Sequence, residues 1–117
     1  MERVNEREKP FRGGDSGVKY LFRGPKTDWG IIVMKPGERL GAHYHNEVEE
    51  TFYLVEGRCK FYVNGVEYQA VAGDAFRLEA PERHDIWNDS DAPARFIFIK
   101  VPYLPHDKVD APYGESE

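Results

Sequence analysis

Hydrophobic and polar positions alternate in short runs along most of this chain, and turn residues separate the runs. The runs are rich in β-branched and aromatic residues, and they cover residues 18–23, 30–34, 39–45, 50–55, 58–63, 66–71, 75–78, 84–88 and 94–101. Such alternation sends successive side chains to opposite faces of a strand. We find no convincing helical period in any long segment. Short strands at this spacing predict an all-β sandwich or barrel.

The pair Asn64-Gly65 gives the strongest turn signal in the chain. It stands between Val63 and Val66, each of which belongs to a predicted strand. A type I′ turn needs positive φ at both central residues, and asparagine and glycine tolerate it best. We therefore predict a tight β-hairpin that joins residues 58–63 to residues 66–71.

The alternation also predicts which side chains point inward. In the run 58–63 the positions of Cys59, Phe61 and Val63 are apolar, whereas charged or hydroxyl-bearing residues occupy the other positions. Charged side chains prefer water, so we expect the apolar set to face the core. The run 50–55 carries apolar groups on both faces. This pattern indicates a strand that is covered on both sides, as a second subunit would do.

The chain of 117 residues is long enough for a single domain with one core. We expect residues 1–17, which are polar and contain three glycines, to form a flexible N-terminal arm. Residues 18–101 hold the predicted strands and form the barrel. Residues 102–117 carry three prolines, and we expect an irregular tail that lies across the surface of the domain.

Composition excludes several classes of partner. The net charge of −5 and the lack of a Lys/Arg cluster argue against binding to nucleic acid. No apolar run is long enough to span a membrane. The N-terminus is charged and does not resemble a secretory signal. The single cysteine, Cys59, excludes an intrachain disulfide, so we expect a cytoplasmic protein.

Two histidines and a carboxylate suggest a metal site. His43 and His45 are two residues apart, so their imidazoles project from one face of a strand. The carboxylate is Glu49 or Glu50, and strand parity favours Glu50. A further histidine, His84, stands in another predicted strand. Imidazole and carboxylate ligands suit a divalent transition metal, although an isolated His-x-His pair is equally often a solvated strand face.

The spacing of these residues resembles the first motif of the cupin superfamily. That motif is glycine, five residues, His-x-His, three or four residues, glutamate, six residues and glycine. All of its fixed positions are filled here, by Gly37, His43, His45, Glu50 and Gly57. The match uses the four-residue spacing before the glutamate, and it selects Glu50 independently of strand parity.

The second cupin motif is matched in part. It begins with glycine and ends with histidine, three residues and asparagine, and Gly73, His84 and Asn88 stand at those positions. Between them the family has Pro-x-Gly, but here Glu79 stands in place of the proline and Pro81 in place of the glycine. The departure falls in a turn, so it affects the shape of that loop more than the ligands.

The resemblance implies an antiparallel double-stranded β-helix, which is the jelly-roll barrel of the cupins. It also implies a metal bound inside the barrel by His43, His45, Glu50 and His84. Fe, Mn, Ni, Cu and Zn all suit this ligand set, and the sequence does not choose among them. In an octahedral field these four ligands leave two positions for water or substrate.

Inward-facing residues near the ligands are candidates for lining the cavity, although most are expected to belong to the core. The candidates are Phe52, Cys59, Phe61, Phe76, Ile86 and Asn88. A lone inward cysteine is more often a small core residue than a metal-facing thiol. Asparagine near a turn is more often a hydrogen-bonding turn residue. His106 lies outside both motifs, and we expect it at the surface.

Cupins include dioxygenases, isomerases, decarboxylases and binding proteins, and the fold alone does not choose among them. The leading hypothesis is a metal-dependent enzyme that acts on a small organic molecule. The alternatives are a non-catalytic metabolite-binding or regulatory barrel, and a barrel with a purely structural metal. The sequence shows no general base and no nucleophile motif. We expect a homodimer in which residues 18–23 extend the sheet of the neighbouring subunit.

Overall fold

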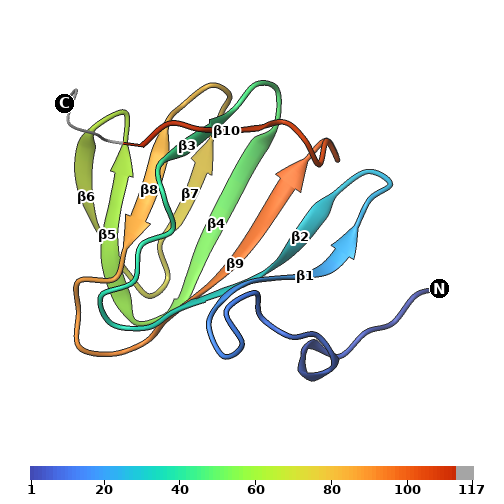
Figure 1. Ribbon diagram of the computed structural model, residues 1–117, viewed down its shortest axis with the longest axis horizontal. Coiled ribbons are helices and arrows are strands. Elements are labelled where there is room, and N and C mark those ends of the chain that lie inside the picture. Colours follow the sequence, from blue (N-terminus) through green and yellow to red (C-terminus); the bar gives the residue numbers. More distant parts are fainter. Residues whose placement is uncertain (113–117) are drawn as a thin grey trace.

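The computed structural model describes residues 1–112 and contains two five-stranded antiparallel sheets that face each other (Figure 1). The strand order is β1-β2-β9-β4-β7 in one sheet and β10-β3-β8-β5-β6 in the other. The chain passes from sheet to sheet, so the fold is a double-stranded β-helix and confirms the predicted fold class. The strands are β1 (Gly17–Arg23), β2 (Asp28–Met34), β3 (His43–His45), β4 (Glu49–Glu56), β5 (Arg58–Val63), β6 (Val66–Val71), β7 (Ala75–Leu78), β8 (His84–Trp87), β9 (Ala94–Val101) and β10 (Lys108–Asp110).

Helical structure within residues 1–112 is limited to one short 3-10 turn, η1 (Glu6–Glu8). None of these residues forms a helix long and apolar enough to cross a membrane. The β5–β6 hairpin has the predicted turn, because Val63 pairs with Val66 and the φ angles of Asn64 and Gly65 are 50° and 83°.

Two elements differ from the predicted runs. The run 39–45 becomes a strand only at His43, because Gly41 interrupts the extended backbone with a φ of 104°. Ahead of that glycine, Arg39 forms an isolated bridge with Trp87. The expected tail contains a strand, β10, which pairs antiparallel with β3.

The core fills the space between the two sheets. Phe52, Leu54 and Phe96 project from the first sheet, and Phe61 and Ile86 project from the second. All five are fully buried, and the rings of Phe52 and Phe61 meet edge-on at 5.3 Å between centroids. The inward faces therefore follow the predicted alternation.

The N-terminal arm contacts the outer face of the first sheet (Figure 1). The Glu6 carboxylate accepts a hydrogen bond from Arg95 of β9 and lies 3.4 Å from Nζ of Lys19 on β1. The same Lys19 ammonium lies 4.1 Å from the centroid of the Phe11 ring. These contacts bury Lys19 and attach the arm to two strands.

Candidate metal centre

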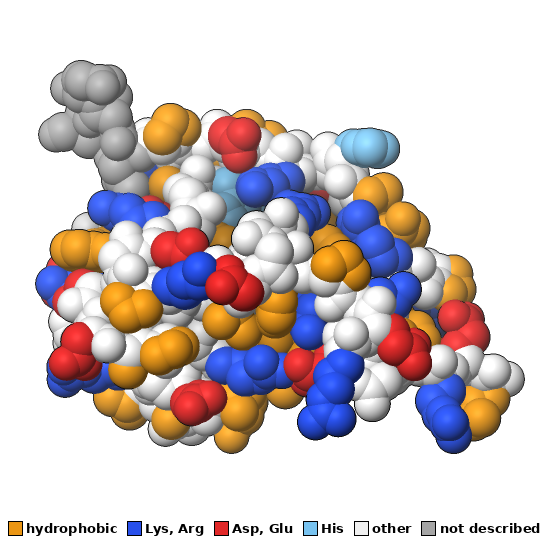
Figure 2. Space-filling model, turned by 60° about the horizontal axis from the view of Figure 1, so that its bottom comes forward, with side chains coloured by type: hydrophobic (Ala, Val, Ile, Leu, Met, Phe, Trp, Pro, Cys, Tyr) orange, Lys and Arg blue, Asp and Glu red, His pale blue; other side chains and the backbone are white. Residues whose placement is uncertain are grey.

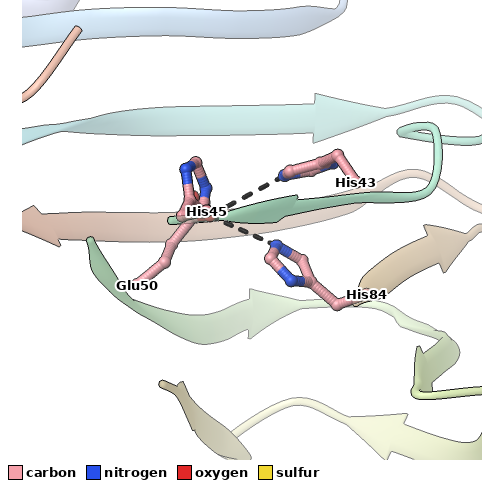
Figure 3. A group of neighbouring side chains, drawn as sticks. All are labelled: His43, His45, Glu50 and His84. Atoms are coloured by element: carbon pink, nitrogen blue, oxygen red, sulfur yellow. Dashed lines mark hydrogen bonds and ion pairs between the residues drawn. The ribbon is translucent and has the colours of Figure 1, made fainter. Parts of the chain in front are cut away.

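The four predicted ligands come together from three strands (Figure 3). His43 and His45 project from β3, Glu50 from β4 and His84 from β8. One ligand atom from each side chain lies within 4.8 Å of the other three, and all four residues are buried. The β3–β8 pairing sets His43 directly opposite His84 and so joins the two motifs.

Glu50 is the common neighbour of the three imidazoles. Its Oε1 atom lies 3.0 Å from Nε2 of His45, 3.3 Å from Nε2 of His84 and 3.9 Å from Nε2 of His43. Glu49, the alternative carboxylate, has a half-exposed side chain near Arg77. Glu50 is therefore the carboxylate of the cluster, as strand parity and motif spacing predicted.

Two of the histidines have fixed tautomers. Nδ1 of His43 donates to the carbonyl oxygen of Gly41 at 2.7 Å, and Nδ1 of His84 donates to that of Glu82 at 3.1 Å. A carbonyl only accepts hydrogen bonds, so each Nδ1 carries a hydrogen. In the neutral ring, each Nε2 then presents a lone pair toward Glu50. Nδ1 of His45 is buried and has no hydrogen-bond partner among residues 1–112.

The electrostatics of the cluster favour a bound cation. Burial works to raise the pKa of Glu50, but its contacts with the rings of His43, His45 and His84 and the charge of Lys100 hold that pKa well below its usual value. Burial lowers the pKa of His43, so this imidazole is neutral at pH 7. The lone pair on Nε2 of the neutral His43 ring and the anionic Glu50 carboxylate repel each other. A divalent cation among them removes that repulsion.

The donor set fits a transition metal. Three imidazole nitrogens and one carboxylate oxygen are the ligand types that iron, manganese, nickel, copper and zinc accept. The backbone carbonyls behind His43 and His84 orient the rings in the way that second-shell groups orient metal ligands. The cluster is thus able to bind a divalent metal ion, and its ligand types do not determine which one.

A cavity of about 140 Å³ adjoins the cluster, and His43 and Glu50 form part of its wall. Its remaining lining is apolar, basic or phenolic, and comes from Arg12, Val18, Tyr20, Arg23, Ile32, Leu40, Phe98, Lys100, Pro105 and Lys108. Figure 2 shows Lys and Arg side chains gathered beside a partly hidden histidine on this side of the molecule. A larger hollow of about 700 Å³ lies beneath the N-terminal arm and touches none of the four ligands, so it is not the candidate site.

The six candidate lining residues lie outside this cavity wall. Four of them, Phe52, Cys59, Phe61 and Ile86, belong to the buried core, and Phe76 stacks on Phe61 at 4.2 Å between ring centroids. The Asn88 amide nitrogen donates to the carbonyl oxygens of Met34 and Ala92, so this residue braces a turn. Phe52 still contacts the site, because its ring lies 5.7 Å from that of His84.

Sequence reasoning missed the residues that do line the cavity. Most of them lie on β1, β2 and β9 and in both terminal stretches, which carry no part of either motif, and Leu40 occupies a variable position of the first motif. One signal was available in β9, where Ala94, Phe96, Phe98 and Lys100 occupy the same face. A lysine on the same strand face as three inward apolar residues indicates that the barrel interior is polar at that end of the strand.

Comparison with known proteins agrees with this geometry. The sequence model of the Cupin domain family matches residues 30–100. Polyketide synthase CurC of Streptomyces cyaneus is 36% identical over 76 residues, which are 65% of this chain and 49% of that protein. Protein SchB of Streptomyces halstedii is 32% identical over 100 residues, which are 80% of this chain and 70% of that protein. Quercetin 2,3-dioxygenase of Bacillus subtilis (strain 168) is 30% identical over 95 residues, 78% of this chain and 28% of that protein.

The chain spans about half the length of CurC, so that relative contains residues with no counterpart here. Among solved structures, an uncharacterized protein with a double-stranded β-helix domain from Klebsiella pneumoniae superposes with a TM-score of 0.82. The alignment covers 95% of this chain and 97% of the other at 16% identity, and it shows a shared fold.

Proposed function

The chain belongs to the cupin domain family, and from this premise we propose that it binds a divalent transition metal and acts on a small anionic organic molecule. The proposed ligands are His43, His45, Glu50 and His84. The observation that carries the proposal is the convergence of these four side chains beside a cavity with basic side chains. A metal held here supplies a Lewis acid that polarises a substrate oxygen.

The charge of the lining favours an anion. Arg12, Arg23, Lys100 and Lys108 face the cavity, and Glu50 is the one carboxylate among its lining residues. Such a surplus of positive charge attracts a carboxylate or an enolate. The volume of about 140 Å³ corresponds to roughly four or five water molecules at ~30 Å³ each. The site therefore suits a compact molecule.

The apolar part of the lining suits a short carbon skeleton. Val18, Ile32, Leu40 and Phe98 contribute hydrocarbon surface to the same cavity. The names of two relatives refer to polyketide synthesis and to dioxygenation of quercetin. Because the lining is basic rather than wholly apolar, we favour isomerase or decarboxylase chemistry on an oxo acid over oxidative cleavage of a hydrophobic substrate.

A second candidate function is a metabolite-binding barrel without turnover. Apart from His43 and Glu50, which are proposed ligands, the cavity lining contains no imidazole or carboxylate to act as a base. In a pure binding protein, a ligand at the metal would be recovered chemically unchanged, and this outcome distinguishes the two functions.

We also propose a homodimer. Tyr53 and Val55 of β4 and Ile99 and Val101 of β9 expose large apolar side chains on the outer face of the first sheet. Among residues 1–112, β2 is the only strand that pairs with β1. Apart from the Val18 carbonyl oxygen, which accepts from the N–H of Arg12 at 2.9 Å, the other edge of β1 can pair with a second chain. Both features support an association of two copies through this sheet.

The metal site is tested by calorimetric titration with Zn²⁺ of the wild type and of two matched variants. Glu50→Gln removes the carboxylate charge in the cluster, and Glu49→Gln removes the neighbouring charge on the outer face. We expect one tight site in the wild type and in Glu49→Gln, and an affinity at least ~10-fold weaker in Glu50→Gln. Thermal melting of each variant verifies that it is folded. Equal affinities in all three proteins would refute the ligand assignment.

The substrate class is tested on the zinc-loaded protein with pyruvate, a small oxo acid that presents two oxygens to a metal. We expect saturable binding that weakens as salt is added, because basic side chains attract the carboxylate. The uncharged analogue acetone is the control and should bind far more weakly. Equal binding of the two molecules would argue against an anion site.

A further inference from the structure

Tyr20 of β1 and Lys100 of β9 meet on the wall of the cavity that adjoins the metal cluster. The Lys100 Nζ atom donates a hydrogen bond to the Tyr20 hydroxyl oxygen at 2.8 Å. Lys100 is also the direct cross-strand neighbour of Glu50 in the β4–β9 pair. A phenol and an ammonium group thus share a small space with two of the proposed ligands.

A glycine in β2 brings the tyrosine to this position. Gly30 pairs with Tyr20 on one side and with Phe98 on the other. A Cβ atom at Gly30 would lie 2.0 Å from the carbonyl oxygen of Lys19 and 2.8 Å from Cα of Tyr20. Because Gly30 has no side chain, the Tyr20 ring crosses β2 and packs against the Phe98 ring in a T-shaped arrangement, with 5.2 Å between the two ring centroids. The fold therefore holds the hydroxyl within reach of Lys100.

Three positive charges surround the Tyr20 ring. The Arg23 guanidinium carbon lies 3.9 Å from the ring centroid, the Lys100 Nζ 5.3 Å and the Arg12 guanidinium carbon 5.6 Å. Arg23 is itself fixed by two hydrogen bonds to the buried Asp28 carboxylate, at 3.0 and 3.1 Å. A negative charge on the Tyr20 oxygen during proton transfer would be stabilised by this arrangement.

We propose that Tyr20 is the proton carrier of this site and that Lys100 positions it, an inference that rests on the proposed metal-dependent function. The substrate class is an enolisable oxo acid. The Tyr20 hydroxyl first transfers its proton to water. The phenolate so formed then removes a proton from the carbon next to the ketone, and a new O–H bond forms on Tyr20. The electron pair of the broken C–H bond becomes the C=C bond of the enolate, whose charge moves onto oxygen. The reverse step returns a proton to carbon, Lys100 stays protonated throughout, and no oxidant or reductant takes part.

The test is exchange of the methyl protons of pyruvate in D₂O, followed by proton NMR with the zinc-loaded protein. We expect exchange well above the protein-free rate in the wild type, and a rate lower by ~100-fold or more in Tyr20→Phe. The matched control, Tyr68→Phe, removes a hydroxyl from an exposed residue of β6 and should exchange at the wild-type rate. Lys100→Met should lower the rate by at least ~10-fold.

A second readout separates proton transfer from structural damage. Calorimetry should show that Tyr20→Phe binds Zn²⁺ and pyruvate within about threefold of the wild-type affinities, because only a hydroxyl is lost. An unchanged exchange rate in Tyr20→Phe would overturn the inference. Binding of metal and pyruvate by the wild type without exchange would also overturn it and leave the proposed metal and anion site standing. If the wild type bound no metal, the inference would fall together with the proposed function.

Discussion

At the scale of single residues, the three imidazoles of the cluster are not equivalent. His43 and His84 each use Nδ1 to bind a backbone carbonyl, whereas Nδ1 of His45 has no partner in the part of the chain that the structure describes. The sequence predicted one shared face for His43 and His45 from strand parity alone. It could not predict the carbonyls of Gly41 and Glu82, because a carbonyl direction depends on loop conformation and not on residue type.

The lone cysteine allows a test of burial at a single residue. Cys59 is 1% exposed and lies in the core, as the sequence favoured. Burial, and to a lesser degree the negative charge of Asp89, raises the pKa of its thiol from 9.0 to about 12. The thiol of the unfolded chain therefore loses its proton at a lower pH than the thiol of the folded protein.

This difference predicts a loss of stability in alkali. Between about pH 9 and pH 12 the folded state binds the proton that the unfolded state has released, so the free energy of unfolding falls as pH rises. One such group contributes a slope of about −1.4 kcal/mol per pH unit in this window. We expect Cys59→Ala to lack this contribution, as measured by urea unfolding at several pH values. Identical pH slopes in the two proteins would contradict the burial argument.

At the scale of elements, β3 is a strand of three residues that depends on its neighbours. It lies between β8 and β10, so the terminal stretch supplies one of its two partners. The loop that follows β3 is held by Asp107, whose carboxylate accepts hydrogen bonds from the backbone N–H groups of Glu47 and Val48, both at 2.9 Å. This loop connects His45 to Glu50, so Asp107 fixes the spacing of two proposed ligands.

Removal of that carboxylate should weaken the metal site from a distance. In Asp107→Ala the N–H groups of Glu47 and Val48 lose their acceptor, and the His45–Glu50 loop becomes looser. We expect Zn²⁺ affinity to fall by roughly 10- to 100-fold, the range typical of groups that orient metal ligands, as measured by calorimetry. The control is Asp110→Ala, which removes an exposed carboxylate of β10. Equal losses in both variants would assign the effect to charge and not to the loop.

The predicted strands were found where hydrophobic alternation was regular. Runs such as 58–63 and 94–101 coincide with β5 and β9, because each is rich in aromatic or β-branched residues and keeps one face wholly or largely apolar. β10 was missed because three residues in a proline-bearing stretch are too few to show a period. Its pairing with β3 is a long-range contact, which local pattern does not specify.

At the scale of the whole molecule, the outer face of the first sheet is covered in part. The N-terminal arm covers the region around Lys19 and Arg95, because Glu6 of the arm forms ion pairs with both residues. Beyond the arm, Tyr53 and Ile99 are 44% and 40% exposed. The sequence indicated a strand at residues 50–55 with apolar groups on both faces, and the structure agrees: Phe52 points into the core and Tyr53 points outward.

The proposed homodimer is tested by placing a charge in this apolar area. In Ile99→Glu a carboxylate would be buried between two copies without a partner, which costs far more than its exposure on a monomer. Val66→Glu places the same charge on β6 of the opposite sheet, at a side chain that is 53% exposed. We expect light scattering at micromolar concentration to give a dimer for the wild type and Val66→Glu, and a monomer for Ile99→Glu.

A monomeric wild type would refute the association, and a dimeric Ile99→Glu would move the interface to another face. Because Tyr20 and Lys100 point to the inside of the same sheet, Ile99→Glu should still bind Zn²⁺, so loss of association and loss of the site can be measured separately.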